Sequence, residues 1–346
     1  MNDEEPKNPG RQTFIRKGHA TGAHASHSAI EPKRRRILRK WVSYIFLSVF
    51  AVVMVYPFAF MIATSLQSDN VMVKTSENPI EPILWKEKKF ENYVRVFSKN
   101  ERTGSRTFLR FYVNSLIVTV LMTIGQVGTS ALAAYAFSRL QFPGRDLLFL
   151  CYLGTMMIPF VVTLIPNYIL LSKLPAFLDH LFRTDYFTSY LYLPGCPSVS
   201  IGRAIGIDSY FALTIPCMFS ASGTFLLRQF FMTLPKDLEE AAKIDGCGLW
   251  RIFTNVILPL SKPALATISI FTFMGAWGSF LWPLIVTNSE FLKVLPVGLN
   301  SFQGLYTSQW NLLMTASILM ILPMIGVFLL GQRYFISGIT MGAVKG

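Results

Sequence analysis

Six long apolar runs alternate with polar connections along the chain. A helix rises about 1.5 Å per residue, so about 20 apolar residues cross the roughly 30 Å hydrocarbon core of a bilayer. The six predicted spans are residues 41–66, 112–137, 147–172, 209–230, 263–288 and 311–331. Residues 1–40 lack apolar periodicity and are predicted to form a disordered basic tail. We therefore expect an all-helical membrane protein whose folded part covers residues 41–346.

Six crossings would place both ends of the chain on one side of the membrane. A basic run directly precedes the first span and favours the cytoplasm for that side: Lys33, Arg34, Arg35, Arg36, Arg39 and Lys40. The loop 138–146, the segment 231–262 and the end 332–346 are then cytoplasmic. The outer loops are 67–111, 173–208 and 289–310. The first outer loop is also rich in Lys and Arg, so charge alone leaves the orientation open.

Composition supports a membrane protein and narrows its chemistry. The chain is 52% hydrophobic and 15% charged, below the roughly 25% charged residues usual in soluble domains. Part of the net charge of +13 lies in the run before the first span, where it suits anionic lipid headgroups better than nucleic acid. The four cysteines are scattered and indicate no metal site or disulfide framework.

The predicted spans contain almost no charge, and this limits the possible energy source. Among Asp, Glu, Lys, Arg and His, the spans contain Arg228 alone, close enough to an end to reach the headgroups. Proton-coupled carriers usually place ionisable groups at membrane depth. Sodium coupling through carbonyl and hydroxyl groups stays open. The Gly-Lys pair of a phosphate-binding loop is absent from the sequence, so any pumping energy must come from a partner.

The polar segment between the fourth and fifth spans, residues 233–259, is typical of helix, turn, helix. Pro235 suits a first helical turn, and the acidic residues Asp237, Glu239 and Glu240 complement the positive end of a helix dipole. Asp245 and Gly246 offer a turn that ends this helix. A second short helix with one apolar face is expected to run from about Leu249 towards Pro259.

This segment carries a specific resemblance. The order Glu240-Ala241-Ala242, three residues, Gly246, nine residues, then Val256-Ile257-Leu258-Pro259 resembles the EAA loop of ATP-binding-cassette (ABC) importer permeases. In that family the loop docks in a cleft of a separate ATPase subunit. The resemblance implies that Glu240 pairs with the ATPase and that Gly246 supplies the bend. The alternative is an amphipathic helix that rests on the membrane surface.

The resemblance extends from about Trp41 to the C-terminus and narrows to the carbohydrate-uptake, maltose-type branch. Three further segments carry it: Tyr56-Pro57-Phe58, residues 133–139, and the end of the chain, where Gly342, Lys345 and Gly346 look like a terminal motif that can reach the ATPase interface. Two features depart from the pattern. Gly278 and Ser279 follow Trp277 where relatives usually carry Asn and an acidic residue. The outer segment 175–206 is longer than in typical relatives. The extra length suits either a small lid or an added contact for the binding protein.

The resemblance implies half of a pore in the inner membrane of a prokaryotic cell, working by alternating access. Its implied partners are a second permease subunit, two ATPase subunits and an extracytoplasmic solute-binding protein. ATP and Mg would bind the ATPase, and this chain would bind no cofactor. Candidates for lining a sugar path are Asn114, Gln126, Trp277 and Trp282, although each also suits a packing role. The alternatives are an ATP-independent carrier or channel, and an ABC permease for a non-sugar solute such as glycerol phosphate.

Overall fold

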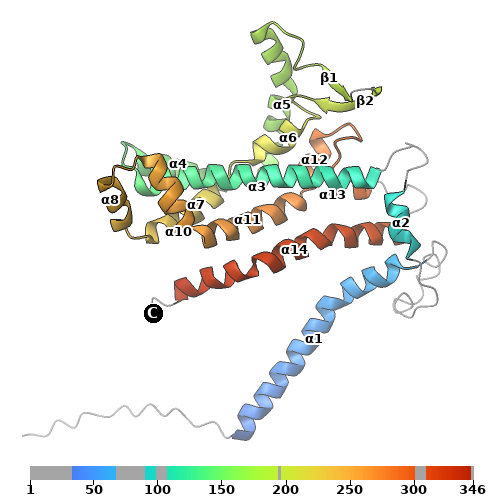
Figure 1. Cartoon of the computed structure of the whole chain (residues 1–346). Helices are drawn as coiled ribbons and strands as arrows, with labels where there is room; N and C mark the ends of the chain where they lie inside the picture. The colour runs from blue at the N-terminus through green and yellow to red at the C-terminus, as the bar shows by residue number, and fades with distance from the viewer. Residues whose placement is uncertain (1–32, 68–89, 99–106, 194–195, 301–308, 344–346) are drawn as a thin grey trace, which may run out of the picture. The chain divides into compact units, whose positions relative to one another are not determined.

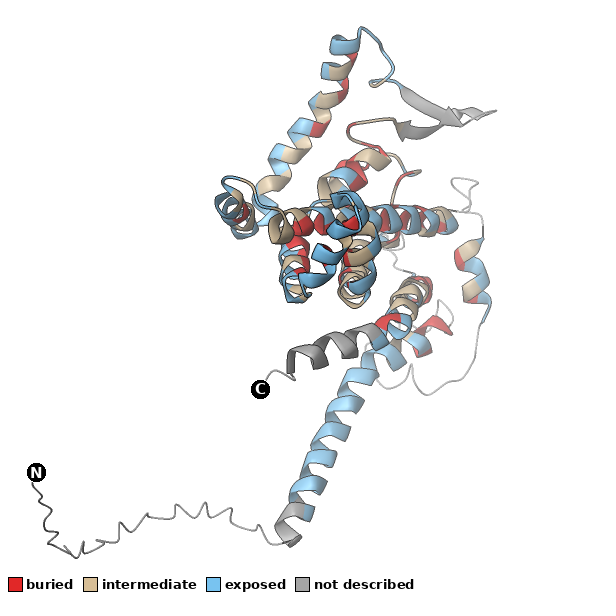
Figure 2. Ribbon diagram, turned by 60° about the vertical axis from the view of Figure 1, so that its left-hand side comes forward, coloured by how far each residue is buried: buried red, intermediate tan, exposed pale blue. Residues whose placement is uncertain are grey.

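The structure is a computed structural model that describes residues 33–67, 90–98, 107–193, 196–300 and 309–343. The chain divides into two units, Met1–Val55 and Tyr56–Gly346, and each is described by itself. The described part of the first unit is the beginning of helix α1 (Lys33–Ser65). The apolar side chains of α1 up to Val55 are exposed (Figure 2), as expected of a helix surrounded by lipid. The tail was predicted to be disordered to residue 40, but residues 33–40 are helical at the start of α1, and residues 1–32 lie outside the described residues.

The second unit consists of helices, short 3-10 and π-helical turns, and one hairpin. After the end of α1 come α2 (Glu91–Phe97), α3 (Thr107–Arg139), α4 (Arg145–Gly154), η1 (Thr155–Met157) and α5 (Phe160–Phe182). The hairpin strands are β1 (Tyr190–Leu193) and β2 (Cys196–Arg203). There follow α6 (Tyr210–Thr214), η2 (Ile215–Cys217), α7 (Ala221–Thr233), α8 (Asp237–Ile244), α9 (Leu249–Ile252), η3 (Phe253–Ile257) and α10 (Leu258–Leu260). The last are α11 (Lys262–Trp277), α12 (Leu281–Val286), α13 (Leu295–Leu299) and α14 (Trp310–Ala343).

Four helices among the described residues are long and apolar enough to cross a membrane: α1, α3, α5 and α14. Two bent pairs reach the same standard when each pair is taken together. One joins α6–η2 to α7 with a bend of 45°, and the other joins α9–α10 to α11 with a bend of 79°. By length and composition the structure therefore has four spans, or up to six if each bent pair crosses once.

Three predicted spans are each interrupted in the structure. The predicted span 147–172 is interrupted between η1 and α5, because Pro159 has no N–H to continue the helix and disfavours helical geometry at Ile158. The apolar helix begins after this break and continues to Phe182. The predicted span 209–230 is divided between η2 and α7, and 263–288 between α11 and α12.

Helix α3 lies at the centre of the second unit. It packs against α7 and α11, and α11 in turn packs against α14. Figure 1 shows α3, α11 and α14 running alongside one another. The buried residues gather where these helices meet, as the red segments of Figure 2 show. Among the apolar clusters along α3, one surrounds Trp282 and Val286, and another surrounds Phe231 and Ile252.

The hairpin, which falls in the segment 175–206 predicted to be an outer loop, was not part of the all-helical prediction. Its strands pair antiparallel, with Tyr190 opposite Arg203. Aromatic residues in β1 and β-branched residues in β2 favour extended backbone over helix. The buried carboxylate of Asp179, near the end of α5, accepts hydrogen bonds from the backbone N–H groups of Phe187 and Thr188, at 2.9 and 2.8 Å. These bonds fix the chain that leads from α5 into the hairpin.

Candidate functional site

The segment 237–260 folds as a helix, a turn and a second helix, as predicted. We refer to α8, α9, η3 and α10 together as the helix–turn–helix segment. The acidic residues of its first helical turn, Asp237, Glu239 and Glu240, complement the positive end of the α8 dipole. The second helix widens into the π-helical turn η3 and then continues through α10, which holds Pro259. This segment therefore has the local geometry expected from the motif.

The turn between α8 and α9 depends on Gly246. Its φ of 77° lies in the left-handed region, which favours glycine. The N–H of Cys247 donates to the carbonyl of Ala242 at 2.9 Å, and the N–H of Gly246 donates to that of Lys243 at 3.0 Å. These two bonds make a Schellman motif, which satisfies carbonyls left open at the end of a helix. The predicted role of Gly246 as a bend matches this geometry.

Two adjacent glutamates of α8 have opposite environments. Glu240, the predicted docking residue, is exposed, and Glu239 is buried. Glu239 Oε1 lies 2.9 Å from Nε of Arg139, the last residue of α3. The sequence did not predict this ion pair, although Arg139 belongs to the segment 133–139 that carries the family resemblance. The sequence also does not indicate which of the two glutamates is buried, because both lie in the first turn of α8.

The second helix is anchored by its apolar side. Ile252, Phe253 and Ile257 are buried in a cluster formed with α3, α7 and α11. The hydroxyl of Tyr135 on α3 donates to the carbonyl of Leu249 at 3.3 Å. The predicted motif residues Val256 and Leu258 are half-buried against this cluster. Burial of this side fixes the segment on the helical bundle.

The opposite side of the segment exposes apolar side chains. Ile244 is 87% exposed and Trp250 is 67% exposed, with Leu238 and Leu249 also exposed near them in the chain. Ala241 and Pro259 of the motif are exposed, and Ala242 is half-buried. A group of large apolar side chains on a polar segment marks a site of contact with a protein or a membrane. We call Leu238, Glu240, Ile244, Leu249 and Trp250 the docking face.

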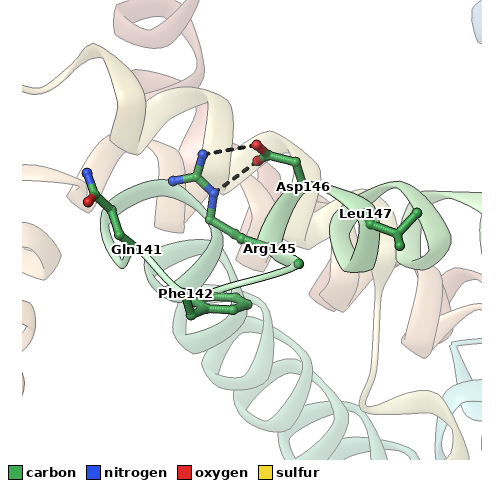
Figure 3. A pocket seen from close by; sticks show the side chains of 6 residues that line it. Gln141, Phe142, Arg145, Asp146 and Leu147 are labelled. Atoms are coloured by element: carbon green, nitrogen blue, oxygen red, sulfur yellow. Dashed lines mark hydrogen bonds and ion pairs between the residues drawn. The ribbon is translucent and has the colours of Figure 1, made fainter.

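The loop that joins α3 to α4 lies at the same end of the bundle as α8 (Figure 1). It forms an open pocket of about 350 Å³, lined by Gln141, Phe142, Gly144, Arg145, Asp146 and Leu147. Figure 3 shows the Arg145 guanidinium facing the Asp146 carboxylate, with Nε 3.0 Å from Oδ1. Hydrogen bonding to Arg145 holds the pKa of Asp146 below its ordinary value. An open pocket with a carboxylate already paired offers little to hold a small ligand.

The candidate path residues are mostly committed to internal contacts. The amide of Asn114 donates to the carbonyls of Phe291 and Lys293, at 2.5 and 3.1 Å, and accepts from the hydroxyl of Tyr210 at 2.7 Å. Asn114 is 3% exposed. Its contacts hold the loop after α12 against α3. Nothing in these contacts leaves the Asn114 amide available to a solute.

The two tryptophans are also packing residues in this chain. The indole N–H of Trp282 donates to the carbonyl of Ala212 at 2.9 Å, and that of Trp277 donates to the carbonyl of Met320 at 2.9 Å. Both side chains are buried. Gln126 is half-buried on α3. Of the predicted C-terminal contact residues, Gly342 belongs to α14, while Lys345 and Gly346 lie outside the described residues.

These observations define a class: a multi-pass helical membrane protein with an exposed, partly apolar helix–turn–helix between two of its spans. Residues 126–340 match the model of the family described as "Binding-protein-dependent transport system inner membrane component". The chain belongs to this family, and it is a permease subunit of a transport system.

Several permeases are similar to the chain over nearly its whole length. The arabinooligosaccharides transport system permease protein AraQ of Bacillus subtilis is 31% identical, over 87% of this chain and 94% of that protein. The trehalose/maltose transport system permease protein MalG of Thermococcus litoralis is 32% identical, over 90% of this chain and 99% of that protein. The sn-glycerol-3-phosphate transport system permease protein UgpE of Yersinia pestis is 32% identical, over 86% of this chain and 94% of that protein.

The fold is also similar to that of a solved transporter. A chain of a bacterial ABC transporter involved in the import of the acidic polysaccharide alginate superposes with a TM-score of 0.69. The match covers 88% of this chain and 98% of that chain, at 22% sequence identity. The shared fold therefore extends well beyond the helix–turn–helix segment.

Proposed function

We propose that this chain is the membrane-spanning subunit of an ABC importer that takes up a sugar or an oligosaccharide. A second permease subunit would complete the pore, two ATPase subunits would dock on it, and an extracytoplasmic solute-binding protein would deliver the solute. ATP and Mg would bind the ATPase subunits, which would carry out the hydrolysis. Both termini and the docking face would lie in the cytoplasm, with the hairpin outside.

One observation carries this proposal: the helix–turn–helix segment is anchored by one side and exposes apolar side chains together with Glu240 on the other. Such a face has the chemistry of a protein contact, with an apolar centre and a charged group beside it. An ATPase seated there would bury Ile244 and Trp250, and Glu240 would meet a basic side chain of the ATPase. Closure of the two ATPase subunits would then shift the segment and reopen the pore on the other side, as alternating access requires.

A sugar as solute is supported by the relatives, two of which carry arabinooligosaccharides or trehalose and maltose in their names. The second candidate is glycerol phosphate, supported by the similarity to the sn-glycerol-3-phosphate permease. Proteoliposomes that contain the assembled importer can separate the two candidate solutes. Their uptake is measured with radiolabelled arabinotriose, maltose, trehalose and glycerol 3-phosphate. Uptake of glycerol 3-phosphate alone would contradict a sugar importer. Uptake that continues without ATP would favour a carrier or channel.

Co-purification tests the docking face. The wild-type chain should retain a candidate ATPase subunit encoded with it, whereas Glu240→Ala should retain less and Gly246→Pro should lose both binding and transport-stimulated ATP hydrolysis. Glu290→Ala is the control, because Glu290 belongs to the predicted outer loop and pairs with Lys293 at 3.7 Å. Equal retention by wild type and both loop variants would contradict ATPase docking at this face.

Cysteine labelling tests the orientation. In a chain whose native cysteines are replaced, Ile244→Cys and Tyr186→Cys each place one thiol at a well-exposed position. A membrane-impermeant maleimide added to intact cells should label position 186 and spare position 244. The reverse pattern would invert the proposed topology.

A further inference from the structure

Arg139 lies where three elements of the second unit meet. Its Nε is 2.9 Å from Glu239 Oε1 of α8. Its Nη2 donates to the carbonyls of Phe231, at 2.5 Å, and Leu234, at 2.8 Å, at the end of α7. One guanidinium at the end of α3 therefore holds both the end of α7 and the start of the helix–turn–helix segment.

The ion pair is removed from solvent. The side chains of Arg139 and Glu239 are 3% and 9% exposed. A buried ion pair is weak evidence for stability, because apolar residues of similar volume often serve a fold as well or better. What an apolar pair does not supply is a buried guanidinium that attracts the Glu239 carboxylate while it donates hydrogen bonds to two carbonyls of another helix. The arrangement is suited to fixing the position of α8 relative to α3.

A second contact from α3 acts on the other helix of the segment. Tyr135 lies one turn before Arg139, and its hydroxyl donates to the Leu249 carbonyl at the start of α9. Thus α3 is joined to α8 by an ion pair and to α9 by a hydrogen bond. Glu240 and the exposed apolar side chains of the docking face take no part in these contacts, so they are free to bind a partner while the segment stays attached to α3.

Helix α3 also reaches the far end of the bundle. Its 33 residues extend for about 50 Å. Near its beginning, Asn114 bonds the carbonyls of Phe291 and Lys293, and the hydroxyl of Ser115 accepts from the N–H of Leu295 at 2.6 Å. The same helix therefore bonds the helix–turn–helix segment at one end and the loop between α12 and α13 at the other.

We propose that Arg139 and Glu239 are positioning residues that make α8 move together with α3, so that a displacement of the docking face is carried along α3 to the opposite end of the bundle. This inference rests on the proposed function, since it takes an ATPase as the source of the displacement. It assigns the two neighbouring glutamates different tasks. Glu240 binds the partner, and Glu239 transmits the resulting movement.

The test measures the attachment of α8 to α3 directly. Spin labels are placed at Gly128 on α3 and Lys243 on α8, both exposed, in a chain whose four native cysteines are replaced. The distance between the labels is measured by double electron–electron resonance in lipid nanodiscs. Wild type is compared with Glu239→Gln, with the paired variant Arg139→Met/Glu239→Met, and with Arg139→Lys. Glu290→Gln, which breaks the Glu290–Lys293 pair of the predicted outer loop, is the control.

In the chain alone, the distance distribution should be narrow in wild type and in Glu290→Gln. It should be at least twofold broader in Glu239→Gln and in the paired variant. The width for Arg139→Lys should lie between that of wild type and that of these two variants. The paired variant removes both charges, so it leaves no unpaired buried charge to destabilise the fold. If the variant chain still folds and assembles, a broad distance distribution therefore reports lost positioning of α8 and not lost stability. A paired variant as narrow as wild type overturns the proposal.

The same samples with a bound ATPase test transmission. The paired variant should retain the ATPase within about twofold of wild type, yet hydrolysis stimulated by the solute-binding protein should fall at least fivefold. Weaker ATPase binding by Glu239→Gln than by Glu240→Gln would contradict the division of tasks. If wild type binds no ATPase, the proposed function fails, while the distances in the chain alone still decide whether Arg139 and Glu239 position α8.

Discussion

The carboxylate of Asp208 accepts a hydrogen bond from the backbone N–H of Ser289 at 2.9 Å, joining the loop before α6 to the loop after α12. The same oxygen accepts from the N–H of Asn288 at 3.1 Å. Asp208 is 2% exposed, and its φ of 58° is left-handed. Together with Asn114, which bonds the carbonyls of Phe291 and Lys293, it holds the chain after α12.

Asp208→Ala should lower the free energy of unfolding by about 2–4 kcal/mol. The change leaves two backbone N–H groups without their acceptor and places an alanine in left-handed backbone. Asp208→Asn should cost about 1 kcal/mol, because asparagine tolerates this backbone and keeps an acceptor oxygen. Thermal unfolding of the purified chain in detergent measures both. Equal losses for the two variants would contradict a role for the side-chain acceptor.

The turn at Gly246 predicts a sharp difference between two nearby glycines. Gly246→Ala should cost about 1–2 kcal/mol, because alanine disfavours a φ of 77°. Gly248→Ala should be nearly neutral, since Gly248 has a φ of −71° and open space where a Cβ would stand. Transport-stimulated ATP hydrolysis should fall in Gly246→Ala and persist in Gly248→Ala. Similar activity in both variants would show that the bend is unimportant.

Trp282→Phe should destabilise the chain by about 1–3 kcal/mol without changing which solute is carried. The indole N–H bonds the carbonyl of Ala212, and Pro216, four residues later, has no N–H to offer that carbonyl. Phenylalanine would keep the ring contact with Phe160 but leave the buried acceptor unpaired. Unfolding measurements and a comparison of sugar selectivity test this. A change in selectivity at unchanged stability would instead support a place in the translocation path.

Close packing at Gly298 predicts a steric effect. A Cβ at this position would overlap the ring of Phe111, so Gly298→Ala should cost about 1–3 kcal/mol through overpacking. The second change Phe111→Leu should recover part of that loss. Gly275→Ala in α11 is the matched control, because a Cβ there meets no neighbour within 4 Å. Thermal unfolding of the three variants decides the matter, and an equally large effect at Gly275 would contradict it.

The sequence predicted the all-helical membrane class because hydrophobic length is a strong signal, whereas the described residues hold four such helices, or up to six if each bent pair crosses once. It predicted the helix–turn–helix because caps, acidic residues and Gly246 agree with one another. It did not reveal the break before Pro159, since proline is tolerated within many membrane helices. The hairpin was missed because its four- and eight-residue strands lie in a segment without a long apolar run.

The candidate site shows a different limit. Glu239 and Glu240 are chemically identical and differ by about 100° around the helix axis. Which of them is buried depends on Arg139, a residue of another helix. Likewise Asn114 suits a sugar path by its chemistry, yet its amide is occupied by the carbonyls of Phe291 and Lys293. Local patterns identify the chemical groups, and tertiary contacts decide which of them remain available.

The direction in which the docking face points depends on the number of residues in the π-helical turn η3. The turn holds one more residue than an α-helical turn and lies between Trp250 and α11. Loss of one residue there would rotate Trp250 by about 100° about the helix axis relative to α11. Relatives that share an ATPase partner should therefore vary in side chains along residues 253–257 more readily than in residue count. An alignment gap in this stretch would mark a subunit that binds its ATPase in another orientation.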